Sequence, residues 1–524
     1  MKMQQITIAV LLALVLGVPF LMSAGKKGTG HTPGTRKLII VTPHVPQIRD
    51  EFGAGFVEWH KREFNEDVSI DWRTPGGTSE IRKSLNALFK QAIKDNIQGE
   101  DYTIDDGGVL RFANTKTIPF DIFFGGGSFD HGLIKDGVTV DVDTPDGGKE
   151  SIEVSMSRPA DFTQGELDTI FGENKIGPQQ LYDPGQRWIG TALSSFGIVY
   201  NGDVFAKLGL ENPTAFEDLT APELSGWIAL ADPRQSGSIT TTFDSILGNE
   251  GWEDGWRILR GMCGNTRYFT NSSTKPPIDV SQGEAAAGLA IDFYGRGQAQ
   301  IIKDSGGGDR VGYTDPSGAV YVDADPVSIV NGCPDYKLAA RFVRYTLTDE
   351  AQALWQFKKN DPDNPLGSDG EPMGPRWHEL RRMPVKRSMY VDYVDYFVDK
   401  ADPFKLVSKV ENPGWRTGVQ VMMGCFGIDI ANECRAAYTA LNKAEVARNS
   451  GMITSEEFAE LDALFYAFPE TEIDGEMVPF TSDTFRTVRN VWRDSKVQAQ
   501  LEIEYTDFYR QNYREIVRRV KAIK

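Results

Sequence analysis

Glycines and small hydroxylic residues gather at three places in this 524-residue sequence, each between a short apolar run and a helical pattern. The three loops are Gly76-Gly77-Thr78-Ser79, Gly125-Gly126-Gly127-Ser128 and Ser236-Gly237-Ser238-Ile239-Thr240. Glycine permits a tight turn, and Ser or Thr caps the first turn of a helix. Such a loop presents N–H groups and hydroxyls at the positive end of a helix, which suits an anionic or hydroxylated ligand. An ordinary capped turn has the same residues, so the loops alone leave both interpretations open.

Catalytic and cofactor motifs are missing from the sequence. The histidines, His31, His44, His60, His131 and His378, show neither HxxxH nor HExxH spacing, which excludes a zincin. GxSxG, GxGxxG and GxxxxGK[ST] do not occur either, so a common serine hydrolase and a nucleotide-binding loop are unsupported. We therefore predict no catalytic residues, no metal site and no cofactor.

The four cysteines are too few for a disulfide scaffold, and none forms a CxxC pair, so a zinc ribbon is excluded. The sequence leaves open whether Cys263 pairs with Cys333, or Cys425 with Cys434. Hydrophobic residues make up 40% of the chain and charged residues 25%, as in folded globular proteins. The 56 Lys and Arg against 74 Asp and Glu give a net charge of −18, which argues against a nucleic-acid partner.

The N-terminus has the pattern of an export signal. Residues 6–24 carry no charge, follow Lys2 and end in Ser23-Ala24-Gly25. A positive start, an apolar stretch and a small-residue exit are typical of a secretory signal peptide. An apolar segment of about 20 residues also just spans a bilayer, so a membrane tether through residues 6–24 is the alternative. We expect residues 1–25 to be a signal peptide or anchor, residues 26–35 to be a linker, and the folded part to lie in the periplasm or outside the cell.

The periodicity that follows is typical of an α/β fold. Leu38–Val41 is a continuous apolar run, residues 48–59 have apolar positions at helical spacing, and Val68–Trp72 is a second strand pattern. These segments predict a βαβ unit. Residues 133–188 are acidic and rich in turn residues, which predicts an inserted hairpin and loops outside the core. Beyond Phe357, a Pro- and Gly-rich stretch leads into a mainly helical extension over 358–524.

Several ordered segments between about Arg36 and Phe357 resemble the extracellular solute-binding proteins of ATP-binding-cassette (ABC) importers, in particular the ferric-ion, polyamine and sugar-phosphate binders. The most specific are ADPRQSGS at 231–238 and the stretch 280–294. The other matching segments are Leu38–His44, Gly76–Ser79, Phe120–Gly126, Gly197–Asn201 and Asp325–Gly332. Residues 133–188 and the C-terminal extension depart from the usual compact member.

The resemblance implies a type II periplasmic-binding fold, in which two α/β lobes close over one solute. It places the first lobe at 36–192 and 320–357 and the second at 193–319. The solute-binding residues that it implies are Pro43, His44, Gly77, Thr78, Ser79, Gly126, Gly127, Ser128, Ser195, Ser236, Gly237, Ser238, Thr240, Asp292 and Tyr294. It also implies an ABC permease as the partner and a binding protein rather than an enzyme. Asp325 is expected to support the hinge.

The loops favour an oxyanion, such as a sugar phosphate or a phosphonate, with His44 as a further donor. A bare ferric ion is disfavoured because no pair of adjacent tyrosines occurs. A ferric complex and a polyamine remain alternatives within the family. Outside it, the alternatives are a membrane-anchored solute sensor and an exported enzyme on the same scaffold.

Overall fold

The structure is a computed structural model that describes residues 35–97, 102–104, 110–112, 118–143, 147–316, 319–411 and 413–523. The predicted signal or anchor at 1–25 and residues 26–34 of the predicted linker lie outside this part of the chain. Within the described ranges, no helix combines the length and the apolar character needed to cross a membrane.

The first lobe begins with the predicted βαβ unit. Strands β1 (Arg36–Val41) and β2 (Val68–Arg73) are parallel, and helix α2 (Pro46–Phe64) connects them. Strand β5 (Ile122–Phe124) pairs in parallel with the other edge of β1. Apolar side chains from this sheet and from α2 form one buried core, in which Phe52 packs on Phe124 and Trp355. The helices on this lobe are α3 (Thr78–Ile97), α4 (Ser128–Asp136), α5 (Gln164–Phe171), α11 (Tyr336–Thr346) and α12 (Asp349–Gln356).

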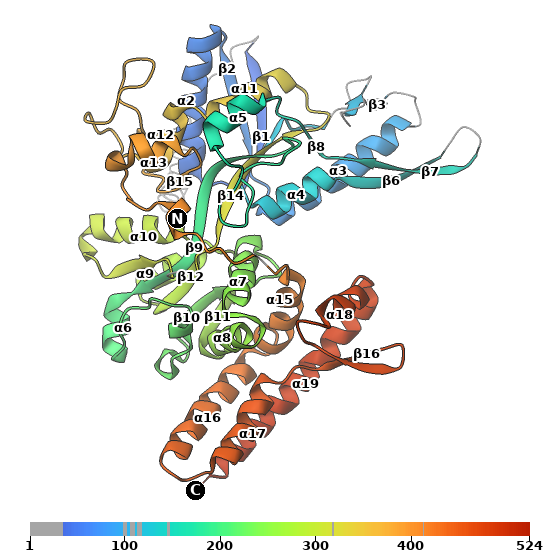
Figure 1. Cartoon of the computed structure of the whole chain (residues 1–524), viewed down its shortest axis with the longest axis vertical. Helices are drawn as coiled ribbons and strands as arrows, with labels where there is room; N and C mark the ends of the chain where they lie inside the picture. The colour runs from blue at the N-terminus through green and yellow to red at the C-terminus, as the bar shows by residue number, and fades with distance from the viewer. Residues whose placement is uncertain are drawn as a thin grey trace, which may run out of the picture.

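Two long strands join the lobes. Strand β9 (Ile189–Asn201) pairs over its first half with β14 (Val322–Val330) and over its second half with β12 (Ala287–Ile291), in both cases antiparallel. Strand β14 continues into the first lobe and pairs with β5. The continuous order is therefore β11-β10-β12-β9-β14-β5-β1-β2, and Figure 1 shows β9 and β14 running between an upper and a lower body.

The second lobe repeats the α/β pattern. Strand β10 (Ile228–Ala231) pairs in parallel with β11 (Thr266–Thr270) on one side and with β12 on the other. Strand β13 (Val311–Thr314) pairs antiparallel with β9. Its helices are α6 (Gly202–Leu208), α7 (Gly237–Glu250), α8 (Trp252–Asn265), α9 (Lys275–Gln282) and α10 (Asp292–Ile302). In both lobes the parallel strands end toward the boundary between them, where ligands of open α/β sheets bind.

Residues 133–188 differ in part from the expectation. The predicted hairpin exists as β6 (Val138–Asp143) and β7 (Lys149–Val154), but the segment that follows belongs to the core of the first lobe. Phe171 and Leu181 are fully buried there. The expectation was wrong for this segment because its apolar residues are widely spaced among polar ones. Their side chains become a core only when the first lobe folds against them.

The C-terminal region has two parts. Up to about residue 411 the chain is mostly irregular and returns to the crossing strands, where β15 (Met383–Pro384) pairs with β9. The prediction of a mainly helical region over 358–524 is confirmed from Arg416 on, but it is wrong for most of residues 358–411, where the helices are short. The elements of the whole C-terminal region after β15 are α13 (Ser388–Asp392), α14 (Pro403–Leu406), α15 (Arg416–Met423), α16 (Ala431–Asn449), α17 (Ser455–Tyr466), β16 (Glu470–Ile473), β17 (Glu476–Pro479), α18 (Phe485–Val491) and α19 (Ser495–Lys521).

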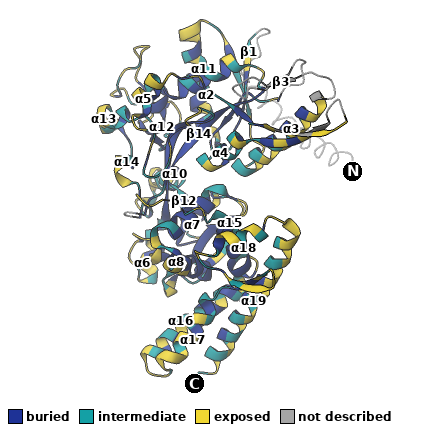
Figure 2. Ribbon diagram, turned by 45° about the vertical axis from the view of Figure 1, so that its right-hand side comes forward, coloured by how far each residue is buried: buried dark blue, intermediate teal, exposed yellow. Residues whose placement is uncertain are grey.

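This helical region shares its hydrophobic core with the second lobe. Trp256 of α8 contacts Phe426, whose ring packs on Tyr509 of α19. Arg260 of α8 is fully buried and donates to Tyr509 Oη and to the Ala467 carbonyl, at 3.2 and 2.8 Å. Figure 2 shows buried residues along the side of these helices that faces the lobe and exposed residues at their far end. The helical region is therefore built into the second lobe.

The cysteines that the sequence left unassigned form no disulfides in the structure. Cys263, Cys425 and Cys434 are buried, and Cys333 is half-buried. Burial raises the pKa of Cys425 and Cys434 to about 12, so both thiols stay protonated at neutral pH.

Candidate binding site

A cavity of about 440 Å³ lies at the boundary between the two lobes. Each lobe supplies three loops that follow strands of its sheet. The first lobe contributes the ends of β1, β2 and β5, and the second the ends of β10, β11 and β12. Helices α3, α4, α7, α9 and α10 begin at or just after these loops, so their positive ends are directed toward the cavity region. The sheet topology thus brings together loops that are far apart in the sequence.

Most of the predicted solute-binding residues line this cavity. They are Pro43, His44, Gly77, Thr78, Ser79, Gly126, Gly127, Ser236, Gly237, Ser238 and Tyr294. Their contact with a solute remains a prediction, because the structure contains no ligand. The wall also includes the loop Asn271–Thr274 after β11, which the sequence analysis did not select. This loop contains no glycine, but Ser272, Ser273 and Thr274 are hydroxylic like the residues of the selected loops, and that signal could have indicated it.

Four predicted residues, Ser128, Ser195, Thr240 and Asp292, are not part of this wall. Thr240 Oγ1 donates to the carbonyls of Pro233 and Ser236, at 2.7 and 2.9 Å. Ser195 Oγ donates to Asp315 Oδ1 at 2.8 Å. Both hydroxyls are therefore engaged within the protein and are not part of the cavity wall.

Asp292 is fully buried at the start of α10. Burial raises the pKa of this carboxyl to about 7, against the attraction of Arg296. The first turn of α10 therefore keeps Asp292 inside the second lobe, while Phe293 and Tyr294 reach the cavity wall.

Two glycines at the end of β5 have a conformation and surroundings that exclude a side chain. Gly125 and Gly126 have φ values of +97° and +112°, a region that glycine occupies readily. A Cβ at Gly125 would overlap the ring of His44, and one at Gly126 would overlap the side chain of Thr78. The glycines thereby let the loops after β1, β2 and β5 pack against one another in the cavity wall.

The second lobe presents a connected set of hydroxyls. Ser236 caps α7, and its Oγ lies 3.2 Å from Ser238 Oγ. Ser238 Oγ lies 3.1 Å from Ser273 Oγ, in the loop before α9. Because a hydroxyl can rotate to donate or accept, this set can adapt to the oxygen atoms of a solute.

His44 belongs to a buried polar network at the base of the cavity. Its Nε2 lies 3.0 Å from Asp325 Oδ2, and Asp325 also forms an ion pair with Arg382. Arg382 in turn donates to Ser194 Oγ at 2.7 Å. Burial and the nearby Arg382 and Arg49 hold the pKa of His44 well below its ordinary value, so the ring is neutral.

The neutral ring has one N–H donor. Nε2 faces both Asp325 Oδ2 and Arg382 Nη1, at 3.0 and 3.2 Å, and Nδ1 has no hydrogen-bond partner among the described residues. The expected role of His44 as a further donor to an oxyanion stays a prediction. Asp325 contacts Arg382 and His44 where the strands cross, and its hinge role stays a prediction.

A second buried carboxylate, that of Asp323 in β14, contacts the N-terminus of α4. Ser128 N donates to Asp323 Oδ2 at 3.1 Å, so the carboxylate occupies the N-terminus of this helix. Burial raises the pKa of Asp323 to about 6, in spite of the hydrogen bonds from Ser128. Ser128 is therefore engaged within the protein and not presented to the cavity.

Cationic side chains of the cavity wall were not selected from the sequence. Lys83, Arg234, Arg382 and Arg416 all line the cavity. Arg382 and Arg416 come from the C-terminal region, beyond the segments that carried the family resemblance, so no local signal marked them. Arg416 donates to the Gly237 carbonyl at 3.0 Å and to Thr241 Oγ1, and its guanidinium lies 4.3 Å from the centre of the Phe129 ring. Arg416 thus contacts both lobes.

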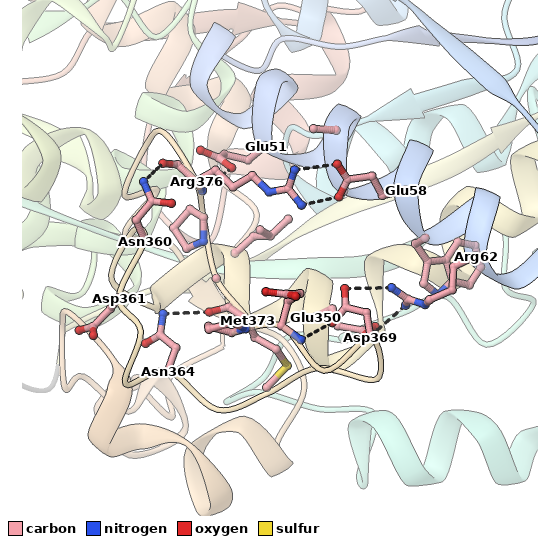
Figure 3. Close-up of a pocket in the computed structure, with 18 of the residues that line it drawn as sticks. Glu51, Glu58, Arg62, Glu350, Asn360, Asp361, Asn364, Asp369, Met373 and Arg376 are labelled. Atoms are coloured by element: carbon pink, nitrogen blue, oxygen red, sulfur yellow. Dashed lines mark hydrogen bonds and ion pairs between the residues drawn. The ribbon is translucent and has the colours of Figure 1, made fainter.

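A further cavity, of about 550 Å³, lies on the first lobe under residues 360–376 (Figure 3). Both arginines in its wall are paired with carboxylates. Arg376 forms a two-pronged ion pair with Glu58, and Arg62 bridges Glu350 and Asp369 at 3.1 and 3.2 Å. These pairs attach the loop to α2. Among the described residues, no group of three or more His, Cys, Asp or Glu side chains could hold a metal ion here or elsewhere.

The two α/β lobes, the crossing strands and the polar cavity between the lobes have the two-lobe arrangement that the resemblance implied. Residues 162–380 match the family model described as bacterial extracellular solute-binding protein. The resemblance drawn from the sequence is thereby confirmed.

The curated relatives match shorter segments. An uncharacterized protein of Haemophilus influenzae is 27% identical over 170 residues, which is 32% of this chain and 46% of that protein. The phosphoglycerate transport regulatory protein PgtC of Salmonella typhimurium is 27% identical over 106 residues, which is 20% of this chain and 27% of that protein. The matched segments thus span less than half of these relatives.

Solved structures with a similar fold include a ferric binding protein from Campylobacter jejuni, with 13% identity and a TM-score of 0.46. Another is the periplasmic binding protein AfuA from Actinobacillus pleuropneumoniae with fructose 6-phosphate bound, with 16% identity and a TM-score of 0.45. Each alignment covers 76% of this chain and 99% of the other.

Proposed function

We propose that this protein is an exported solute-binding protein that captures a small oxyanion, such as a sugar phosphate or a phosphonate, in the interlobe cavity. It would deliver the solute to the permease of an ABC importer, in the periplasm or at the cell exterior. The predicted lobes, 36–192 with 320–357 and 193–319, would be the bodies that close. The export signal at 1–25 is part of the proposal.

The observation that carries the proposal is an imbalance in charge pairing around the cavity. Each carboxylate in its wall has a partner within the protein: Glu80 accepts from Gly77 N, Asp130 from Arg82, Asp323 from Ser128 N, and Asp325 from His44 and Arg382. Two of the cations have no carboxylate partner at salt-bridge distance among the described residues, although Arg416 donates to the neutral Gly237 carbonyl and Thr241 Oγ1. Within the described part of the chain, no carboxylate lies within 4.0 Å of the charged nitrogens of Lys83 or Arg416. A bound anion would supply their missing partner.

Charge-assisted hydrogen bonds from such cations are about twice as strong as neutral ones. The N-termini of α3 and α7 and the serine hydroxyls add donors from both lobes. A ligand that contacts both lobes stabilises the closed arrangement by the free energy of those simultaneous contacts. The same cavity therefore accounts for recognition and for closure.

The other solutes expected from the family fit less well. A polyamine needs unpaired carboxylates, and those in the cavity wall are engaged. A bare ferric ion prefers several phenolate or carboxylate oxygens, and Tyr294 is the one tyrosine among the described wall residues. The relative named for phosphoglycerate transport supports a phosphorylated solute, because phosphoglycerate is itself a small oxyanion.

Thermal-shift and calorimetric titrations with fructose 6-phosphate, a phosphonate, spermidine and ferric citrate test the proposal. We expect stabilisation by one of the oxyanions, and loss of at least about 10-fold in affinity in Arg416→Gln, the usual effect of removing one charged hydrogen bond. Lys409→Gln changes the charge equally at an exposed site outside the cavity and should bind normally. Stabilisation by spermidine or ferric citrate alone would overturn the proposal, and turnover of a ligand would favour the enzyme alternative.

A further inference from the structure

A second cavity, of about 820 Å³, adjoins the first. The two share four wall residues, Phe129, Thr241, Asp323 and Arg416. Phe129 and Arg416 are stacked on each other, so this pair separates the cavities. We call the cavity of about 440 Å³ the first chamber and the one of about 820 Å³ the second chamber.

The second chamber is also built from both lobes and from the C-terminal region. The first lobe contributes α4 and the residues around Gln179, the second lobe contributes Thr241 of α7, and the C-terminal region contributes Arg416, Arg489, Trp492 and Arg493. Trp188 and Trp492 supply aromatic wall. The helical extension, which departs from the usual compact family member, therefore forms one side of the interlobe space.

The cations of this chamber are incompletely paired. Lys135 faces Asp183 at 3.4 Å, but no carboxylate of the described residues lies within 4.0 Å of the guanidinium nitrogens of Arg489 or Arg493. Arg489 lies in α18, and Arg493 lies in the turn that follows the end of this helix at Val491. A pair of arginines on one wall is suited to bind a phosphate or carboxylate.

Arg416, between the chambers, has N–H groups that form no hydrogen bond to the described residues. A guanidinium carries five N–H donors, and the described residues accept from Nη1 and Nη2 only, through Thr241 and Gly237. Its remaining N–H groups can serve a solute group placed at the boundary between the chambers.

We propose that the second chamber is a second anion subsite, formed by Arg489 and Arg493, and that the solute is a doubly anionic molecule with one anionic group in each chamber. This inference rests on the proposed function and specifies its substrate class. The first group binds at the helix N-termini and Lys83, the body of the solute lies along Arg416 and Phe129, and the second group binds at Arg489 and Arg493.

A matched pair of probes, fructose 6-phosphate and fructose 1,6-bisphosphate, tests the proposal, because they differ by one phosphate group. Calorimetry on the full chain should give at least 10-fold tighter binding of the bisphosphate. The double variant Arg489→Gln/Arg493→Gln should lose that advantage and bind the monophosphate as before. Arg486→Gln is the control, since Arg486 belongs to the same helix but does not line the chamber.

Equal binding of the two probes would overturn the second subsite and leave the proposed function standing. An unchanged preference for the bisphosphate in the double variant, or an equal loss in Arg486→Gln, would overturn it as well, because the preference would then reflect general attraction between charges. Failure of both sugar phosphates and of the phosphonate to bind would overturn the proposed function together with this inference.

Discussion

Arg382 and Asp325 form an ion pair at the point where the two crossing strands meet, with side-chain exposures of 5% and 1%. Asp325 lies in β14, whereas Arg382 directly precedes β15 in the C-terminal region. The pair also holds His44 at the end of β1. One buried contact thereby connects the first strand, the crossover and the C-terminal region, and it places the chain beyond residue 357 at the base of the binding cavity.

Replacing Arg382 by methionine should destabilise the protein, because Asp325 would remain buried without its cation. Breaking a buried pair from one side typically costs about 3–5 kcal/mol. Urea unfolding followed by tryptophan fluorescence measures the loss. The double variant Arg382→Met/Asp325→Asn removes both charges and should recover a large part of it. Equal stability of the two variants would show that the pair contributes no such coupling.

Asp292→Asn should stabilise the protein in a pH-dependent way. The carboxyl has a pKa of about 7 when folded and about 3.9 when unfolded, so between these values the folded state binds more protons. The free energy of unfolding of the wild-type protein therefore decreases as the pH rises from about 4 to about 7.

The asparagine variant lacks this loss. It should match the wild type near pH 4 and exceed it by roughly 2–4 kcal/mol at pH 8. Urea unfolding at the two pH values provides the comparison. Asp392→Asn, at an exposed position, is the control and should show no gain at pH 8. A variant that is less stable than the wild type at pH 8 would contradict the assigned cost of burying this charge.

Asp323→Asn should increase the affinity for an oxyanion at pH 8. Asp323 lines both chambers, and its pKa of about 6 means that it is negative at pH 8 and mostly neutral at pH 5. A like charge about 10 Å from the ligand costs roughly a factor of 10 at an effective dielectric constant of about 20. The ratio of variant to wild-type affinity for fructose 6-phosphate should therefore fall from about 10 at pH 8 toward 1 at pH 5. Using the ratio cancels the titration of the phosphate itself.

His44 and His131 should stay neutral from pH 8 to pH 5. Burial lowers the pKa of His131 to about 3, and its ring is stacked on Phe123 with Nδ1 2.8 Å from Ser328 Oγ. The pKa of His44 is also well below the ordinary value. Because unfolded histidine takes up a proton below about pH 6.5, each ring removes stability as the pH falls below that value. NMR spectra of the ring protons, assigned with His44→Gln and His131→Gln, should show no movement in this range.

Many of the residues that line the interlobe cavity could be predicted from the sequence. Apolar runs predicted the strands, and glycines beside Ser and Thr marked the loops at strand ends, where an α/β sheet places its ligands. The failures have local causes. Thr240 and Ser195 have the right side chains, but their hydroxyls are satisfied by neighbouring groups, and the first turn of α10 directs Asp292 into the second lobe.

The sequence by itself determined the α/β class, the hydroxyl-rich loops and the likeness to solute-binding proteins, because these depend on short segments and on their order. Tertiary structure decided the charge of the site. Arg382, Arg416, Arg489 and Arg493 come from a region that the pattern assigned to a separate extension, and they reach the interlobe space because that region packs into the core of the second lobe and against the crossing strands. Contacts between residues hundreds of positions apart leave no local periodicity, so only the folded chain brings these cations to the cavities.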